Sequence, residues 1–334
     1  MIVIMNSQEE LLERRIAAAA GPGVEVTAFD PMPGGHSGIT HRATLLRGDG
    51  TVEEVVVKSA PPGRPASGRH DVLRQARVIA ALGSTGRVPV AEVLFAEDGD
   101  PPFFAGELLP GVATEPLIEP ELAEETAELI AARWEAAIAM LAALHATPLA
   151  ELGLAEEPAR TPLEELELWM KTMAAARMDD PSAADLLGAE MTRTAPEAGS
   201  AALVHGDFRL GNIVFEGAKP RGLIDWEIWS VAHPLIDLAW FVQFTDPENY
   251  PGLSRTVPGT PSAEEVVDRY LAAAGQEGDD LAWFLALGCF KLAAIQAHNR
   301  RRHFDGRHHD PLQEQLGPSI DRLLQRGLTV LAKP

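Results

Sequence analysis

The stretch His205-Gly206-Asp207-Phe208-Arg209-Leu210-Gly211-Asn212 tells more about this chain than any other. It places the carboxylate of Asp207 five positions before the amide of Asn212. The apolar run Ile213-Val214-Phe215 follows directly, and such a run is typical of a buried strand. The pattern predicts a polar loop that ends where a strand begins.

A β-hairpin is predicted downstream of this loop. The apolar run after Asn212 is followed by six turn-like residues, 216–221, and then by a second run that ends at Asp225. Pairing Phe215 with Gly222 in an antiparallel hairpin would set Asn212 opposite Asp225.

These polar residues form the parts of a phosphoryl-transfer site. An amide and a carboxylate at the mouth of a hairpin suit Mg²⁺, which takes one or two carboxylates and leaves positions for phosphate oxygens. Asp207 would then be free to orient a hydroxyl and accept its proton. The alternative is an ordinary Asp-Gly turn before a hairpin, with Asn212 and Asp225 simply solvated.

The two motifs resemble those of a known family. His-Gly-Asp with Asn five positions after the Asp, followed by Ile224-Asp225-Trp226-Glu227, is similar to the aminoglycoside phosphotransferase-like branch of the protein-kinase-like fold. The resemblance runs from about Gly34 to about Gly306. It implies that Asp207 is the catalytic carboxylate and that Asn212 and Asp225 are metal ligands, with ATP and Mg²⁺ as nucleotide and metal.

The resemblance also sets the expected architecture. We expect an α+β, bilobal protein-kinase-like fold with a small β-rich N-lobe and a larger, mainly helical C-lobe. The expected boundaries are residues 1–106 for the nucleotide-binding lobe, 107–111 for a hinge and 112–334 for the catalytic and substrate-binding lobe. The hinge follows from Glu107-Leu108-Leu109-Pro110-Gly111, where Pro and Gly end a strand.

Composition narrows the class of protein. With 46% hydrophobic and 23% charged residues, the 334-residue chain has the composition of a soluble globular enzyme with room for two cores. The single cysteine permits no internal disulfide, so we expect a cytoplasmic protein. A net charge of −21 argues against a nucleic-acid partner. The apolar stretch 281–290, stopped by Lys291, is too short to span a bilayer and predicts a core helix, so no membrane partner is expected.

The N-terminal part of the chain supplies candidates for nucleotide binding. The glycine-rich segment contributes Gly34, Gly35, Ser37 and Gly38, whose backbone N–H groups could approach phosphates, although such a segment is also common in ordinary hairpin turns. Lys58 ends a β-branched strand one hairpin later and could reach the phosphates of a nucleotide; alternatively it is solvated.

Two further residues of this part are assigned through the resemblance. Gln75 lies on the apolar stripe of a helix predicted over 69–82, with Gly83 as its cap. The family usually has a glutamate there that holds the lysine, so we expect Gln75 to accept a hydrogen bond from Lys58. Glu107 is expected where an adenine meets the backbone of the hinge.

Four residues of the C-terminal part have roles that stay open. Arg209 is predicted to neutralise the transferred phosphate, with anchoring of the loop as the alternative. Glu227 shares a strand face with Asp225 and is either a metal ligand or a plain surface carboxylate. Asp237 is predicted to cap a helix and, by resemblance, to brace the Asp207 loop. His145, at a helix end, is interpreted as structural.

The acceptor is the least constrained part of the prediction. Segments 233–239, 258–265 and 290–296 resemble the kinase-like domains associated with acyl-CoA dehydrogenases. This indicates a small-molecule phosphotransferase with an alcohol acceptor, most consistent with a hydroxyacyl-CoA or related anionic alcohol. Arg300, Arg301 and Arg302 form either an anion-binding surface or a solvated helix end. The alternatives are an aminoglycoside or macrolide kinase and a nucleotide-binding regulatory protein with little turnover; the sequence does not give the oligomeric state.

Overall fold

The chain forms two compact units. The computed structural model describes residues 2–32, 38–61, 63, 67–119, 125–251 and 256–332, with side chains from residue 9 onward. One unit comprises Met1–Gly111 and Arg221–Ile228, and the other comprises Val112–Pro220 and Trp229–Pro334. The first is rich in β-structure and the second is mainly helical, so the predicted α+β class is confirmed.

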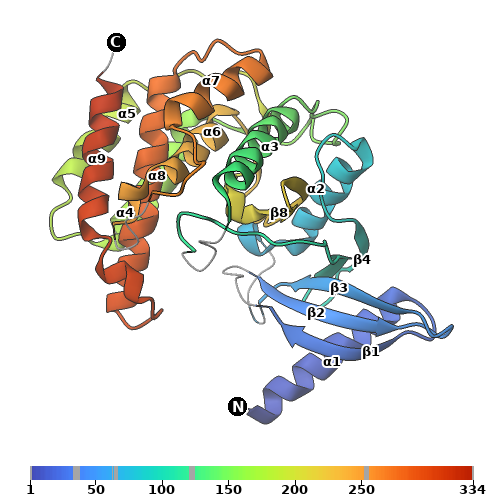
Figure 1. The fold of residues 1–334 in the computed structure, drawn as a ribbon. Coiled ribbons are helices and arrows are strands. Elements are labelled where there is room, and N and C mark those ends of the chain that lie inside the picture. The colour runs from blue at the N-terminus through green and yellow to red at the C-terminus, as the bar shows by residue number, and fades with distance from the viewer. Residues whose placement is uncertain are drawn as a thin grey trace. The chain divides into compact units, whose positions relative to one another are not determined.

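A five-stranded antiparallel sheet forms the centre of the first unit (Figure 1). Its strand order is β1-β2-β3-β5-β4, and every neighbouring pair is antiparallel. The strands and helices of this unit are α1 (Ile2–Ala20), β1 (Glu25–Pro31), β2 (Ile39–Leu46), β3 (Val52–Ser59), α2 (Val72–Thr85), β4 (Val93–Glu97) and β5 (Phe103–Glu107).

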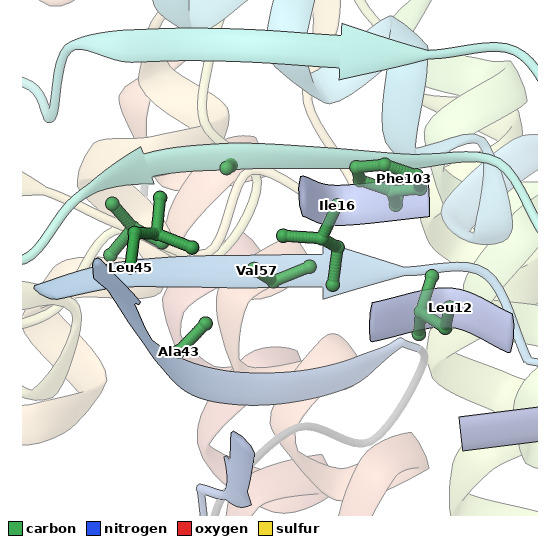
Figure 2. Close-up of a cluster of buried hydrophobic side chains, with 8 residues drawn as sticks. Leu12, Ile16, Ala43, Leu45, Val57 and Phe103 are labelled. Atoms are coloured by element: carbon green, nitrogen blue, oxygen red, sulfur yellow. The ribbon is translucent and has the colours of Figure 1, made fainter. Parts of the chain in front are cut away.

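Alternating side chains of the sheet make the core of this unit. Ala43 and Leu45 of β2 are fully buried, and so are Val55 and Val57 of β3. The two residues of each pair are two positions apart, as expected for a strand with one covered face. Leu12 and Ile16, one helical turn apart on α1, pack over them (Figure 2). The helix α1 therefore covers one face of the sheet.

Helix α2 lies three residues further along the chain than predicted. It starts after Asp71, whose side chain accepts the N–H of Arg74, and ends at Gly86 in the left-handed conformation with φ of 63°. The predicted cap at Gly83 is wrong, because the helix continues from Leu82 through Gly83 to Thr85. The hydroxyl of Thr85 donates to the Leu82 carbonyl at 2.7 Å and thereby satisfies one of the last carbonyls.

Seven helices dominate the described part of the second unit (Figure 1). The long helix α8 contacts α9, α4 and α6, and α3 contacts α7. The bounds are α3 (Ala127–His145), α4 (Pro162–Ala176), α5 (Ser182–Arg193), α6 (Leu235–Phe241), α7 (Ala263–Ala274), α8 (Leu281–Phe304) and α9 (Gly317–Leu331).

Short strands place the loops of this unit. Strand β10 (Ser230–Ala232) pairs parallel with β6 (Ala159–Arg160) and antiparallel with β7 (Ala202–Val204). Strand β8 (Ile213–Glu216) pairs with β9 (Lys219–Leu223), and the chain passes back into the first unit within β9.

The hairpin turn between β8 and β9 is shorter than predicted. Only Gly217 and Ala218 separate the two strands, and Gly217 has φ of 60°. Glycine adopts this conformation without strain, which allows a two-residue turn. The predicted pairing of Phe215 with Gly222, and the opposition of Asn212 and Asp225 that depended on it, is therefore wrong.

Helix α8 also runs further than its apolar segment suggested. It continues through Lys291 to Phe304, and by length and composition alone it is apolar enough to cross a membrane. However, 72% of its most apolar window is buried inside the structure, which is the pattern of a core helix. The predicted length of this segment was wrong, and its predicted burial is confirmed.

Candidate active site

Asp207 lies on the loop between β7 and a short 3-10 helix, Leu210–Asn212, that precedes β8. The indole N–H of Trp240 donates to Asp207 Oδ1 at 2.8 Å, and the amide of Asn212 donates to Oδ2 at 2.8 Å. The Asn212 amide also donates to the Asp207 carbonyl at 2.7 Å. About a quarter of the Asp207 side chain is exposed, 25%. The carboxylate is thus fixed in direction but open to a partner.

Asp237 braces this loop. Its carboxylate is completely buried and accepts the backbone N–H groups of His205 at 2.7 Å and Gly206 at 2.8 Å. The predicted role of Asp237 as the helix N-cap is wrong: Pro234 precedes α6, and Asp237 lies within its first turn. The Asp237 carboxylate instead accepts hydrogen bonds from these two buried backbone N–H groups of the loop.

His145 supports Asp237 from the opposite side. Its Nε2 lies 3.3 Å from Asp237 Oδ2, and its Nδ1 lies 2.7 Å from the hydroxyl of Tyr270. Burial opposes the ionised carboxylate, but hydrogen bonding and charge from His145, with those of His205, hold the pKa of Asp237 below its usual range. This arrangement agrees with a structural role for His145.

Arg209 reaches toward two carboxylates. Its Nε lies 3.6 Å from Asp207 Oδ1 and its Nη1 lies 3.7 Å from Glu115 Oε2. The guanidinium carbon lies 5.8 Å from the centre of the Phe244 ring. These separations exceed ordinary hydrogen-bond lengths, so Arg209 is next to Asp207 without being tightly bound to either carboxylate.

Glu115 is a buried acid beside the same loop. Its Oε2 accepts the N–H of Gly211 at 3.1 Å, whereas its Oε1 is buried and has no hydrogen-bond partner among the described residues. Burial raises the pKa of Glu115 to about 7, against the opposing effects of Arg209 and Gly211. No motif or spacing pointed to Glu115, which lies in a Thr-Glu-Pro segment.

Lys58 lies in the first unit between two carboxylates. Its ammonium is 2.9 Å from Asp225 Oδ1 and 2.8 Å from Glu227 Oε1. Only 11% of the Lys58 side chain is exposed. Burial opposes the charged amine, but Asp225 and Glu227 outweigh it and raise the pKa of Lys58.

The segment that carries these carboxylates is held in an unusual conformation. Asp225 has φ of 68°, in the left-handed region that non-glycine residues seldom adopt. The buried indole of Trp226 donates to the Leu223 carbonyl at 3.0 Å and closes the turn around Asp225. Backbone strain of this kind is concentrated at functional sites.

The charges around Lys58 suit a hard cation. Burial, together with the charge of Asp225, raises the pKa of Glu227 against the pull of Lys58. Two carboxylates share one ammonium, so negative charge is in excess. Among the described residues, no group of three or more His, Cys, Asp or Glu side chains is placed to hold a metal. The two carboxylates of Asp225 and Glu227 match the one or two that Mg²⁺ usually takes from a protein, with waters and phosphate oxygens as its other ligands.

The remaining nucleotide-site candidates are placed as follows. A Cβ added to Gly38 would lie 3.1 Å from Lys58 Cε, so the absence of a side chain leaves room for the lysine stem. Gly34, Gly35 and Ser37 lie outside the described residues. Glu107 ends β5, pairs with Val55 and donates its backbone N–H to the carbonyl of Glu92 at 2.9 Å.

Gln75 does not hold Lys58 as expected. Its side chain is buried, and its amide donates to the carbonyl of Arg69 at 3.1 Å. The acidic partners of Lys58 come instead from the distant segment that contains Asp225 and Glu227. The expected contact between Gln75 and Lys58 is therefore wrong.

Comparison with known proteins identifies the chain's relatives. A family model described as the phosphotransferase enzyme family matches residues 35–287. The chain belongs to this family. The predicted recognition and the predicted class of enzyme, a small-molecule phosphotransferase, are confirmed.

Relatives of known name share part of their length with this family member. It is 31% identical over 255 residues to "Acyl-CoA dehydrogenase family member 11" of Homo sapiens, covering 72% of the chain and 32% of the relative. The identity to the Gallus gallus protein of the same name is 30% over 295 residues, covering 82% and 37%. The chain thus spans about a third of the length of these relatives.

Solved structures confirm the fold of the phosphotransferase. A Ralstonia eutropha protein, solved as a candidate aminoglycoside phosphotransferase, superposes with a TM-score of 0.74 at 19% identity, covering 97% of this chain and 98% of that one. An aminoglycoside phosphotransferase in a ternary complex with AMP-PNP and hygromycin B gives a TM-score of 0.59 at 14% identity, covering 91% and 95%. The bilobal kinase-like architecture is shared with both.

Proposed function

We propose that this phosphotransferase moves the γ-phosphate of ATP to a hydroxyl of an anionic small molecule, such as a hydroxyacyl-CoA. The observation that carries the proposal is the carboxylate of Asp207, which Trp240 and Asn212 hold at both oxygens while part of it stays exposed. A carboxylate fixed in this way can orient an acceptor hydroxyl before transfer.

Asp207 and Arg209 would act on the acceptor and the transferred group. The hydroxyl oxygen forms the new bond to the γ-phosphorus, the bond to the leaving oxygen of ADP breaks, and the hydroxyl proton passes to Asp207. Arg209, with its guanidinium next to Asp207, would neutralise charge on the transferred phosphoryl group.

Lys58, Asn212 and Asp225 would serve the nucleotide phosphates. The Lys58 ammonium lies beside Asp225, a candidate metal ligand. Glu227, which also contacts Lys58, is a further candidate ligand. Asn212, Asp225 and Glu227 would hold Mg²⁺, whose charge would offset that of the phosphates. Solved aminoglycoside phosphotransferase complexes of similar fold contain AMP-PNP or ADP, which supports an adenine nucleotide. Gly34, Gly35, Ser37 and Gly38 would cover its phosphates, and the backbone near Glu107 would meet its base.

Two observations support a CoA ester as the acceptor. The relatives at about 30% identity carry the name of acyl-CoA dehydrogenases. The end of α8 presents Arg300, Arg301 and Arg302, although Arg301 is paired with Asp305 at 3.0 Å. The net charge of −21 opposes binding of a polyanion at long range, but salt screens that effect beyond about 8 Å under physiological conditions.

An antibiotic kinase is the second candidate. Structural neighbours include a macrolide 2'-phosphotransferase and complexes with hygromycin B or spectinomycin. Their sequence identities of 13–21% support the fold rather than the acceptor. A regulatory protein with little turnover has less support, because the substitution at Gln75 does not disturb the acidic partners of Lys58.

The acceptor can be identified by offering the protein each class of candidate acceptor separately. The protein is incubated with Mg-ATP and either hydroxyacyl-CoAs, aminoglycosides or macrolides, and transfer is followed by mass spectrometry of the acceptor. We expect phosphorylation of a CoA ester, and loss of that product in Asp207→Asn. Turnover of an antibiotic with none on any acyl-CoA would overturn the CoA proposal.

A matched pair of variants tests the basic surface. The triple change of Arg300, Arg301 and Arg302 to alanine should raise KM for the CoA ester and leave KM for ATP unchanged. Arg193→Ala is the control, because Arg193 is also an exposed arginine paired with a neighbouring carboxylate, Glu190. An unchanged KM for the CoA ester in the triple variant would remove this surface from acceptor binding.

A further inference from the structure

Lys291 is a charged residue in the middle of the core helix α8. Only 2% of the residue is exposed, and Phe290 and Leu292 beside it are buried as well. Burial lowers the pKa of Lys291, while Glu165, Asp207 and Asp237 oppose that shift. A buried ammonium is costly unless its surroundings compensate for lost hydration.

Its contacts lead to the Asp207 loop. The ammonium donates a hydrogen bond to the carbonyl oxygen of Gly206, the residue directly before Asp207. It also lies 4.3 Å from the ring centre of Trp240 and 5.0 Å from that of Trp169. A cation over an indole face is attracted by the electron density of the ring, most strongly when water is excluded.

No carboxylate neutralises Lys291 by direct contact among the described residues. Glu165, the acid with the largest effect on it, is engaged elsewhere: its Oε2 lies 2.6 Å from Arg160 Nη1 and its Oε1 accepts the indole N–H of Trp169 at 2.7 Å. The bonding of Lys291 is therefore directed to a peptide carbonyl and two indoles, rather than to an ion-pair partner.

These contacts meet on both sides of Gly206. Asp237 accepts the Gly206 N–H, and Lys291 donates to the Gly206 carbonyl. Gly206 has φ of 86°, which glycine adopts without strain. Because glycine is also free to adopt other conformations, hydrogen bonds from neighbouring side chains are needed to fix its peptide groups. The Lys291 ammonium lies over the indole ring of Trp240, and the N–H of that indole donates to Asp207 Oδ1.

We propose that Lys291 is a positioning residue that aligns Asp207 by holding the Gly206 carbonyl and the Trp240 indole. The proposal rests on the proposed function of Asp207. The ammonium stays buried beneath the loop and touches no substrate; it acts through the backbone on one path and through the indole on the other. Arg209 and Lys291 then serve Asp207 differently, the former beside the exposed carboxylate and the latter from within the core.

The test compares activity with stability in Lys291→Met. Methionine keeps most of the side-chain length and removes the buried charge. We expect kcat for phosphate transfer from Mg-ATP to fall about tenfold to a hundredfold because Asp207 is misplaced, with KM for ATP within about twofold. The melting temperature should change little, because removal of the buried charge offsets the loss of the hydrogen bond to the Gly206 carbonyl. A residue that only filled the core would show lower stability with an unchanged kcat.

A spectroscopic readout makes the test independent of the acceptor. The indole N–H resonance of Trp240 is assigned in a ¹⁵N–¹H spectrum by its disappearance in Trp240→Phe. Asp207→Ala gives its position when the hydrogen bond is lost, and Lys291→Met should move it in the same direction. Lys171→Met, an exposed lysine on α4, is the control and should leave the resonance in place.

Conservative variants guard against a misfolded protein. Lys291→Arg keeps a charged donor and should retain more activity than Lys291→Met, and Lys291→Gln keeps a donor without charge and should lie between them. An unmoved Trp240 resonance with native kcat in Lys291→Met would overturn the proposal while leaving Asp207 as the base. Native turnover in Asp207→Asn with a moved Trp240 resonance in Lys291→Met would instead remove the proposed function of Asp207.

Discussion

Trp240, the penultimate residue of α6, donates its indole N–H to Asp207 Oδ1 at 2.8 Å and thereby fixes one oxygen of the candidate base. The other oxygen receives the Asn212 amide. Rotation of the carboxylate would break at least one of these bonds. Asp207 is therefore pre-oriented before any acceptor binds, which is the condition for efficient proton transfer from a bound hydroxyl.

Asp207→Asn should lower kcat by about a hundredfold or more, because the amide cannot accept the acceptor's proton. The Lys58 cluster is untouched, so nucleotide affinity should stay near native. The new amide also presents a donor to Trp240 or Asn212, which should lower the free energy of unfolding by about 1–3 kcal/mol. Steady-state kinetics, calorimetric nucleotide titration and urea unfolding measure the three effects. Asp268→Asn, at an exposed helical position, is the control, and near-native kcat in Asp207→Asn would contradict the assignment.

Asp225→Ala should abolish the Mg²⁺-dependent part of nucleotide affinity, because the metal links phosphate to protein. It also removes one of the two carboxylates around Lys58, which leaves Glu227 as the described partner. Isothermal titration with ATP, with and without Mg²⁺, measures the difference. Glu53→Ala serves as a control, since Glu53 lies on β3, the strand of Lys58, and also forms an ion pair, with Arg47. Equal ATP affinity with and without Mg²⁺ in the native protein would argue against the metal site.

Glu115 should make stability depend on pH near neutrality. In the folded protein the pKa of Glu115 is about 7, whereas a solvated glutamate has a pKa of 4.5, so between these pH values the folded state binds one more proton than the unfolded state. The free energy of unfolding should then fall as pH rises, by about 1.4 kcal/mol per pH unit at most. Glu115→Gln lacks this titration and should gain up to about 3 kcal/mol relative to the native protein between pH 4.5 and 8.

Urea unfolding of both proteins across this pH range measures the Glu115 effect. Glu128→Gln, at an exposed position of α3, controls for the loss of a surface carboxylate and should follow the native protein. A constant difference between Glu115→Gln and the native protein from pH 4.5 to 8 would show that Glu115 titrates in the same range in both states.

Gln75→Glu should weaken the fold without tightening the nucleotide site. The glutamate cannot donate to the Arg69 carbonyl and would bury a carboxylate at a position that is 2% exposed. We expect the free energy of unfolding to fall by about 1–3 kcal/mol and ATP affinity to stay unchanged. Gln75→Met, which removes the donor without adding charge, separates the two contributions in urea unfolding. Tighter ATP binding by Gln75→Glu would show instead that this residue does reach Lys58.

The fold class and the main helices could be predicted from the sequence because their signals are local. The helix predicted over 69–82 overlaps α2, and Gln75, on its apolar stripe, is buried as the helical spacing indicated. The Asp207 loop was recognisable for the same reason, since its residues are neighbours in sequence. Its roles in catalysis and metal binding stay predictions.

The supports of the site could not be predicted, because they come from distant parts of the chain. Lys58 meets Asp225 across 167 positions, and Lys291 meets Gly206 across 85. A lone lysine within an apolar helix was a usable signal for Lys291. Nothing in the sequence indicated that its partner would be the Gly206 carbonyl. Tightness of the β8–β9 turn was misjudged because Lys219, Pro220 and Arg221 are polar or turn-favouring residues that nevertheless form a strand.

The return of Arg221–Ile228 to the first unit has a consequence for biosynthesis. A ribosome that has delivered only the first 111 residues has supplied the sheet and Lys58 but neither of the lysine's acidic partners. Native pairing of Lys58 must wait until Glu227 has emerged from the ribosome, so the first unit cannot mature in simple N-to-C order. An expression fragment cut after Gly111 would carry an unmatched, largely buried ammonium, whereas one that rejoins residues 221–228 through a linker would restore the pair.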